Sequence, residues 1–128
     1  MADCSCIAVY VDDGPEFSNV VDRRARKEHR CGECGLTIGI GEIFEHAANG
    51  YDGTVTTHKT CKDCESVRSA FFCEGYYYGR IWDDVHGHIP ELVWSGEIPK
   101  GDCMASLTKA ARDKICDMIE EEWEHADD

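Results

Sequence analysis

Hydrophobic residues near the end of the chain recur at steps of three and four positions, which is the spacing of an amphipathic helix. The apolar positions are Ala111, Ile115, Met118, Ile119 and Trp123. Ser106 or Thr108 precedes them and can cap the first turn. The pattern predicts a core helix with one buried face and one acidic face turned to solvent.

Two segments in the middle of the chain predict a β-hairpin. Residues 42–48 (EIFEHAA) can extend as one strand, and residues 54–58 (TVTTH) alternate as a second strand. Asn49-Gly50 and Asp52-Gly53 lie between them, and both dipeptides are typical of tight turns. Residues 38–41 (IGIG) form a short glycine-broken piece before the hairpin.

Helices are predicted on either side of a tyrosine-rich stretch. Residues 61–72 (CKDCESVRSAFF) indicate a helix with Thr60 as its N-cap and Asp63 three positions later, which is a capping-box pattern. Residues 81–89 predict a short second helix, and residues 92–94 predict an extended piece.

Four cysteines in two Cys-x2-Cys pairs are the most specific chemical signal in the chain. Cys31 and Cys34 form the first pair, Cys61 and Cys64 form the second, and residues 35–60 separate them. Two such pairs are typical of a tetrahedral zinc site, in which four thiolates leave no position open for water. The first pair suits a knuckle and the second opens the predicted helix. The order of knuckle, hairpin and helix predicts an α+β fold, a treble-clef zinc finger extended by further helices that include the acidic C-terminal one.

The length of 128 residues corresponds to a single domain. Residues 23–72 would form the zinc-finger core, and residues 73–128 an aromatic-rich segment followed by the acidic helix. The start of the chain lacks the pattern of a secretory signal, and no stretch approaches the roughly 18 apolar residues of a membrane span. We therefore expect a cytoplasmic protein without a membrane partner. Its cysteines would stay reduced, which favours zinc over disulfides or a redox pair.

Other cysteines suggest a second metal site as an alternative to a single structural zinc ion. The candidate ligands are Cys4, Cys6 and Cys73, completed by Cys103, Cys116, His86 or His88. No second Cys-x2-Cys or His-x3-His spacing supports this site. Cys116 also fits the flank of the last helix as a small buried residue.

The charge of the chain is strongly negative. The formal net charge is -13, from 26 acidic and 13 basic residues. Such a field repels nucleic-acid phosphates and favours a protein partner with a basic surface. The candidate partner-binding residues are Asp117, Glu120, Glu121, Glu124, Tyr76, Tyr77 and Tyr78. Met118, Trp123 and the tyrosines also leave room for a homodimer.

Five basic residues before the first cysteine pair indicate binding to a negatively charged partner instead. They are Arg23, Arg24, Arg26, Lys27 and Arg30. A basic stripe beside a zinc finger can bind nucleic-acid phosphates, whereas the simpler interpretation is a solvated segment paired with the chain's own carboxylates. The net charge favours the simpler interpretation.

Several short runs resemble small zinc-finger proteins encoded by tailed bacteriophages and prophages. They are RCGECG at residues 30–35, residues 38–45 with their Gly-Glu-Ile-Phe, Asp52-Gly53, and HKTCKDC at residues 58–64. The resemblance covers about residues 23–78. It implies a phage or prophage origin, the bacterial host cytoplasm and no enzymatic activity.

Three functions fit these observations. The first, which we expect, is a non-enzymatic protein-binding module, such as an anti-CRISPR-like inhibitor of a host nucleic-acid-binding machine or defence system. The second is a nucleic-acid-binding zinc finger or transcription regulator that uses residues 23–30. The third is a treble-clef nuclease of the His-Asn-His type. His58 is near the position of its general base, but residues 65–69 offer neither Asn nor His.

Overall fold

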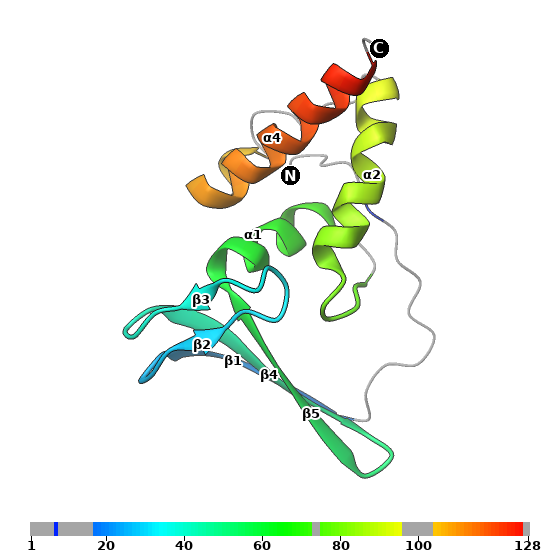
Figure 1. The fold of residues 1–128 in the computed structure, drawn as a ribbon. Helices are drawn as coiled ribbons and strands as arrows, with labels where there is room; N and C mark the ends of the chain where they lie inside the picture. Colours follow the sequence, from blue (N-terminus) through cyan, green and yellow to red (C-terminus); the bar gives the residue numbers. More distant parts are fainter. Residues whose placement is uncertain (1–6, 8–16, 73–74, 96–103, 127–128) are drawn as a thin grey trace.

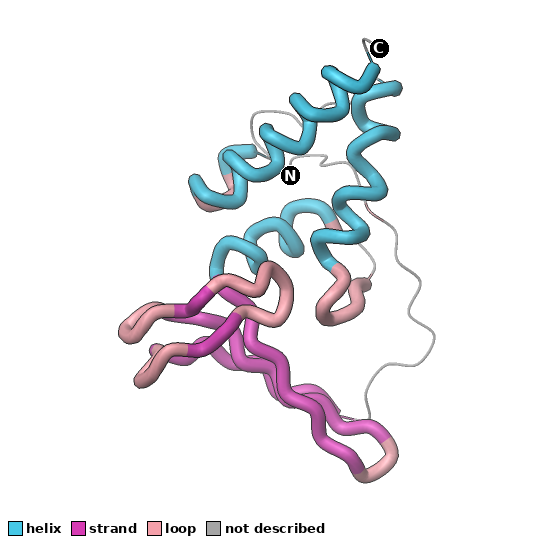
Figure 2. Tube along the Cα trace, viewed as in Figure 1, coloured by secondary structure: helices cyan, strands magenta, loops and turns pink. Residues whose placement is uncertain are grey.

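The strands of the protein lie on one side and the helices on the other (Figures 1 and 2). The computed structural model describes residues 7, 17–72, 75–95 and 104–126. A three-stranded antiparallel sheet has the order β1-β4-β5, and β2 and β3 form a second sheet. The elements are β1 (Phe17–Arg24), β2 (His29–Arg30), β3 (Thr37–Ile38), β4 (Ile43–Tyr51), β5 (Thr54–Cys61), α1 (Lys62–Phe71), α2 (Ile81–Ser95) and α4 (Lys109–Ala126). The predicted α+β class is confirmed.

A two-residue turn at Asp52-Gly53 closes the hairpin of β4 and β5. Tyr51 pairs with Thr54 across it, and the φ angles of Asp52 and Gly53 are 46° and 80°. A type I′ turn requires positive φ at both central positions, which Asp and Gly tolerate. The predicted hairpin is therefore confirmed, with both strands longer than predicted.

The prediction of turn chemistry at Asn49-Gly50 is wrong, because both residues lie inside β4. Asn49 pairs with Ser18 of β1 and Thr56 of β5. Gly50 lies under the ring of Phe17, which would be 2.0 Å from an added Cβ. A glycine inside a strand commonly marks such a close approach. β1 itself was not predicted. All its residues are exposed, so no face is buried and its sequence FSNVVDRR has no apolar period that would indicate a strand.

The predicted helix over residues 61–72 is confirmed as α1, but its predicted cap is wrong. Cys61 occupies the N-cap position in an extended conformation without a side-chain cap bond, since its sulfur contacts another cysteine. Thr60 is the residue before it in β5, and its buried hydroxyl has no hydrogen-bond partner among the described residues. Asp63 instead accepts a hydrogen bond from the hydroxyl of Thr108 at 2.6 Å, which links α1 to the start of α4.

Helix α2 is longer than predicted. It includes residues 92–94, so the prediction of an extended piece there is wrong. Ile81, Val85 and Ile89 lie at four-residue steps and are buried in a core shared with α1 and α4. Pro90 lies inside the helix, where it cannot donate a backbone hydrogen bond. Burial of the apolar face offsets this loss, so the helix continues past the proline.

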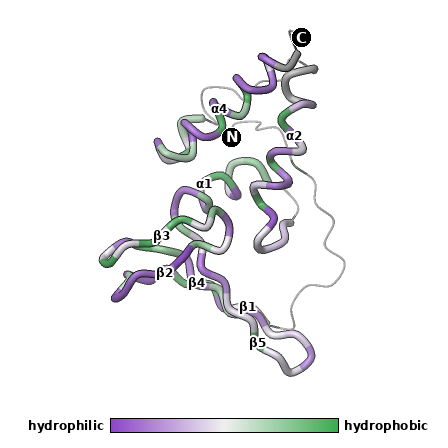
Figure 3. Tube along the Cα trace, viewed as in Figure 1, coloured by the Kyte–Doolittle hydropathy of each residue, from purple (hydrophilic) through white to green (hydrophobic). Residues whose placement is uncertain are grey.

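Helix α4 has the predicted amphipathic pattern, with polar and apolar residues alternating along it (Figure 3). The backbone N–H of Ala111 donates to the hydroxyl of Thr108 at 3.2 Å, so Thr108 is the N-cap. Ala111, Ile115 and Ile119 are buried in the helical core. Trp123 was predicted to continue this face. It is 45% exposed and lies one turn beyond Ile119, which is the last residue of α4 in the described core. No helix in the described ranges combines the length and the apolar character that a membrane span requires.

A buried ion pair joins α1 to the face of β4 that it covers. Nη1 of Arg68 donates to Oε1 of Glu45 at 2.8 Å, and Nη2 donates to the other carboxylate oxygen. The two side chains are only 10% and 4% exposed. The guanidinium also lies 4.6 Å from the centre of the Tyr76 ring. A bidentate pair this buried fixes the position of α1 on the sheet.

Replacing Glu45 by Ala should lower the free energy of unfolding by about 3 kcal/mol or more, because the Arg68 charge would stay buried without its partner. Urea unfolding of zinc-saturated protein measures this loss. The double variant Glu45→Leu/Arg68→Met, which removes both charges, should lose less stability than Glu45→Ala. A double variant that is less stable than the single one would contradict the prediction.

Candidate metal centre and basic cleft

The sulfur atoms of four cysteines lie close together, although the cysteines come from three parts of the fold. Cys31 follows β2, Cys34 lies between β2 and β3, Cys61 ends β5, and Cys64 lies in the first turn of α1. Their Sγ atoms all lie within 4.8 Å of one another. The separations are 3.5 Å for Cys61 and Cys64, 3.8 Å for Cys31 and Cys64, and 3.9 Å for Cys34 and Cys61.

These separations fit a metal ion better than disulfides. A tetrahedral site with Zn–S bonds of about 2.3 Å places its sulfurs about 3.8 Å apart, whereas bonded disulfide sulfurs are about 2.05 Å apart. The structure therefore brings together all four predicted ligands in a site that could bind a metal such as zinc. With four protein ligands, such a site has no position open for water or substrate, so its metal would be structural.

Backbone and indole N–H groups donate to the sulfurs. The N–H groups of Glu33 and Cys61 each lie 3.4 Å from Sγ of Cys31, and Nε1 of Trp82 lies 3.2 Å from Sγ of Cys64. Contacts with the side chains of Cys61 and Cys64 lower the pKa of Cys31 far below its ordinary value. The contact with Cys31 is the main cause that raises the pKa of Cys61 to about 12. The cluster thus stabilises a thiolate, which is the form that binds a metal.

The knuckle between the first two cysteines also holds the start of α2. The carboxylate of Glu33 accepts hydrogen bonds from the N–H of Gly79 at 2.8 Å and of Ile81 at 3.2 Å. A carboxylate at a helix N-terminus satisfies free N–H groups and interacts favourably with the helix dipole. Burial raises the pKa of Glu33, and these hydrogen bonds oppose that effect. The knuckle therefore positions the start of α2 as well as two of the candidate metal ligands.

Trp82 connects the metal centre to the helical core. Its side chain packs against both hydrophobic clusters of the protein, one around the cysteines and one among the helices. Lys114 of α4 lies 4.0 Å from the centre of its ring. Trp82 and Cys64 are 18 residues apart, and no spacing rule in the sequence predicts their contact.

The variant Trp82→Phe should bind zinc about 10- to 100-fold more weakly, because it keeps an aromatic side chain but removes the indole N–H that donates to Cys64. Competition with a chelating dye measures the affinity. Trp123→Phe is the matched control, since Trp123 lies exposed on α4. Equal zinc affinity of the Trp82→Phe variant and the wild type would show that this hydrogen bond does not support the site.

The proposed second metal site lies mostly outside the described residues, because Cys4, Cys6, Cys73 and Cys103 are not among them. Within the described part of the chain, the cysteine cluster is the one group of three or more potential ligands. His88 lies 3.3 Å from the carboxylate of Glu91. Cys116 is exposed on α4, so the prediction that it is buried is wrong.

The tyrosines after α1 contribute to packing against the sheet. The rings of Tyr78 and His58 are stacked 4.1 Å apart, and Tyr76 meets Tyr78 edge-on at 5.4 Å. Tyr77 is 44% exposed. Burial lowers the pKa of His58. His58 is the residue that the nuclease hypothesis names as general base, and its ring is the one that stacks on Tyr78.

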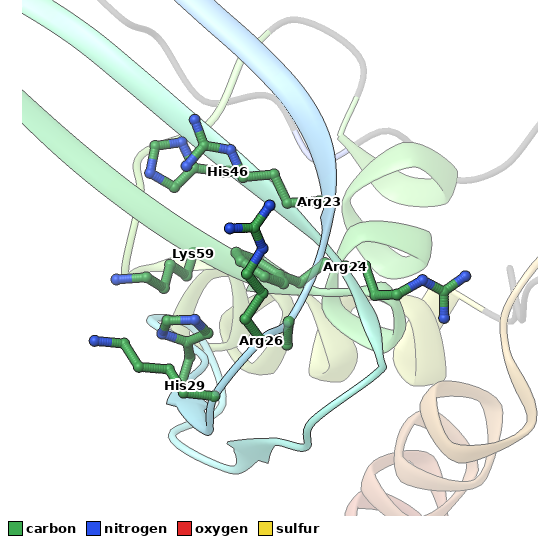
Figure 4. A pocket seen from close by; sticks show the side chains of 9 residues that line it. Arg23, Arg24, Arg26, His29, His46 and Lys59 are labelled. Carbon is green, nitrogen blue, oxygen red and sulfur yellow. The ribbon is translucent and has the colours of Figure 1, made fainter.

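A basic cleft lies beside the metal centre, with a volume of about 1020 Å³. Its lining residues are Arg23, Arg24, Ala25, Arg26, Lys27, His29, Phe44, His46 and Lys59. Figure 4 shows most of their basic groups gathered on one side of β1, with Arg24 pointing the opposite way. Nη1 of Arg24 donates instead to the carbonyl oxygen of Gly41 at 2.9 Å. Arg30 is exposed but does not line the cleft.

The register of the sheet explains how the cleft collects cations. Glu45 pairs with Arg68 of α1, and neighbouring residues of a strand point to opposite faces, so Phe44 and His46 lie on the face of β4 opposite Glu45. His46 pairs with Lys59 of β5, and Phe44 pairs with Arg23 of β1. His46 and Lys59 were not predicted as binding residues, although the hairpin register places them opposite each other.

Four cations of the cleft lack an acidic partner in the described ranges. No ion pair there includes Arg23, Arg26, Lys27 or Lys59, and no acidic residue lines the cleft. Partial burial and the charges of Arg23, Lys59 and His29 lower the pKa of His46. The expected pairing of the basic stretch with the chain's own carboxylates is therefore not found among these residues.

No protein-family model matches the chain, and no curated protein or solved structure matches it. The resemblance to phage and prophage proteins therefore stays a prediction. The acidic residues predicted to bind a partner, Asp117, Glu120, Glu121 and Glu124, are all exposed on α4.

Proposed function

We propose that this protein is a non-enzymatic, zinc-stabilised module that binds nucleic acid through its basic cleft. The cysteine cluster supports the first part. Its ligands come in the order of a treble-clef finger, two from the knuckle at β2–β3 and two from the junction of the β4–β5 hairpin with α1. A closed set of four thiolates supplies folding energy and leaves no position for catalysis.

The metal centre would also organise the cleft. Cys61 is two residues after Lys59, and Cys31 is two residues after His29. The N–H of Gly32 in the knuckle donates to the carbonyl oxygen of Lys59 at 2.8 Å. The elements that hold the metal are therefore the ones that hold cleft residues in place.

The basic cleft is the observation that carries the second part of the proposal. Lys and Arg side chains without acidic partners, gathered in a concavity, focus positive potential and release counterions when they bind phosphates. A volume of about 1020 Å³ is at the upper end of the range for small-molecule pockets. An extended ligand with several phosphates would use the space better than a lone anion.

The net charge of -13 is compatible with this proposal because no acidic residue lines the cleft and the acidic helix α4 lies away from it. The acidic residues of α4 lie on the far side of α1 from the three-stranded sheet (Figure 1). An α-helix with its side chains is about 10 Å thick, and at physiological ionic strength the Debye length is about 8 Å. The acids on α4 are therefore largely screened from a ligand in the cleft.

The deciding experiment is a fluorescence-anisotropy titration of labelled oligonucleotides with zinc-loaded protein at several salt concentrations. We expect binding that weakens steeply with salt and that is lost when Arg23 and Arg26 are reversed to Glu. Salt-insensitive binding, or binding that survives the reversal, would contradict the proposal. An inhibitor that binds a host protein through α4 stays a prediction, which pull-down from nuclease-treated bacterial lysate tests.

A further inference from the structure

We infer that the nucleic acid is single-stranded, with its phosphates in the basic cleft and its bases stacked along the open face of the three-stranded sheet. This inference rests on the proposed function and names its ligand. The open face is defined as the side of β1, β4 and β5 that points away from α1.

The cleft and the open face form one continuous surface. Side chains alternate between the two faces of a strand, so Phe17 and Val21 point to the same side of β1 as Arg23. The ring of Phe17 covers Gly50 of β4, and Gly50 pairs with Val55 of β5. The open face therefore carries cations at the metal end and exposed apolar groups at the hairpin end.

The apolar end of the open face is exposed. Phe17 is 52% exposed, Val55 is 56% exposed and Val21 is 39% exposed. An aromatic ring on an open sheet is a stacking platform for bases, which present a π-face whatever their sequence.

The open face also lacks acidic residues, in a chain with 26 of them. Its residues in the three strands are Phe17, Asn19, Val21, Arg23, His46, Ala48, Gly50, Val55, Thr57 and Lys59, whereas Phe44 is buried and Cys61 belongs to the cysteine cluster. The acidic residues of these strands, Asp22 and Glu45, lie on the opposite face, where they pair with Lys62 and Arg68. A polyanion can therefore extend from the cleft over this face without meeting a carboxylate.

The dimensions favour a strand of several nucleotides. Phe17 and Arg23 are six positions apart, which corresponds to about 20 Å along a β-strand. Single-strand sites of roughly 4 to 16 nucleotides are usual for proteins that combine a basic groove with aromatic platforms. Duplex bases are already stacked on one another and cannot reach Phe17. A free phosphate would occupy the cleft alone, because it has no base that could stack at the apolar end.

The test compares a fluorescein-labelled 12-nucleotide single strand with a duplex of the same length, using zinc-loaded protein. Phe17→Ala should weaken single-strand binding about 5- to 150-fold, the effect of losing one stacked base, and should leave duplex binding unchanged. Phe17→Trp should retain affinity, because indole also stacks. Val20→Ala is the matched control, since Val20 is 47% exposed on the same strand but faces the other side. Thermal unfolding of each variant checks that it folds.

The outcomes separate this inference from the proposed function. Equal loss of single-strand and duplex binding in the Phe17→Ala variant would overturn the inference, as would no loss at all. If the Arg23→Glu/Arg26→Glu variant still lost binding, the cleft function would stand. Wild-type protein that bound neither oligonucleotide would overturn both. Tighter binding to vesicles containing phosphatidylglycerol than to the single strand would assign the surface to a membrane and also overturn the inference.

Discussion

Replacing Cys31 or Cys61 by Ser is expected to unfold the sheet half of the protein and to abolish zinc binding. The hydrophobic cluster around the metal centre has few large side chains: its buried members are Ala25, Cys31, Ile38, Phe44 and Cys64. Binding of zinc contributes about 10 to 16 kcal/mol in isolated zinc fingers, as much as the whole stability of a typical domain. Such a small cluster cannot replace that contribution.

Zinc content measured by mass spectrometry, together with circular dichroism, tests this expectation. Cys116→Ser is the control, because Cys116 is exposed on α4 and lies outside the cluster. Adding a chelator to the wild type should reproduce the effect of the ligand variants. A Cys31→Ser/Cys61→Ser double variant that stays folded without metal would show that zinc is not structural here.

Reversing the charge of Arg23 and Arg26 is expected to weaken nucleic-acid binding at least 100-fold at low salt. Each reversal removes a phosphate contact and adds a repulsive carboxylate to the cleft. The milder variant Arg23→Ala/Arg26→Ala should reduce the slope of log affinity against log salt by roughly 1.4, because each contact with a single strand contributes about 0.7.

The matched control for the cleft is Arg30→Glu. Arg30 belongs to the same basic stretch of the sequence and is exposed, but it does not line the cleft. Anisotropy titrations from 50 to 200 mM salt compare the variants at equal zinc occupancy. If Arg30→Glu weakens binding as much as the double reversal, general charge would explain the binding and the cleft would not.

Part of the basic cleft could have been predicted from the register of the hairpin. The Asp52-Gly53 turn pairs Tyr51 with Thr54, and this pairing fixes the position of every other residue in β4 and β5. His46 then lies opposite Lys59, and Phe44 lies opposite Cys61. The three lining residues of the hairpin, Phe44, His46 and Lys59, could therefore have been placed from the sequence, but the turn chemistry predicted at Asn49-Gly50 obscured the register.

The rest of the cleft could not have been predicted in this way. β1 has eight exposed residues without an apolar period, so nothing local indicates that it pairs with β4 or that Arg23 lies beside Phe44. Glu33 and Trp82 act through contacts with Gly79, Ile81 and Cys64 that are distant in the sequence.

The sequence alone determined that the four cysteines form a cluster that could bind a metal, and it determined the β4–β5 hairpin, α1 and the amphipathic α4. These features depend on spacing, turn chemistry and periodicity, which are local properties of the chain. Only the tertiary structure decided that the basic stretch joins His46 and Lys59 in a cleft on a face free of carboxylates. That arrangement depends on strand pairing between distant segments, and such pairing is set by the whole fold.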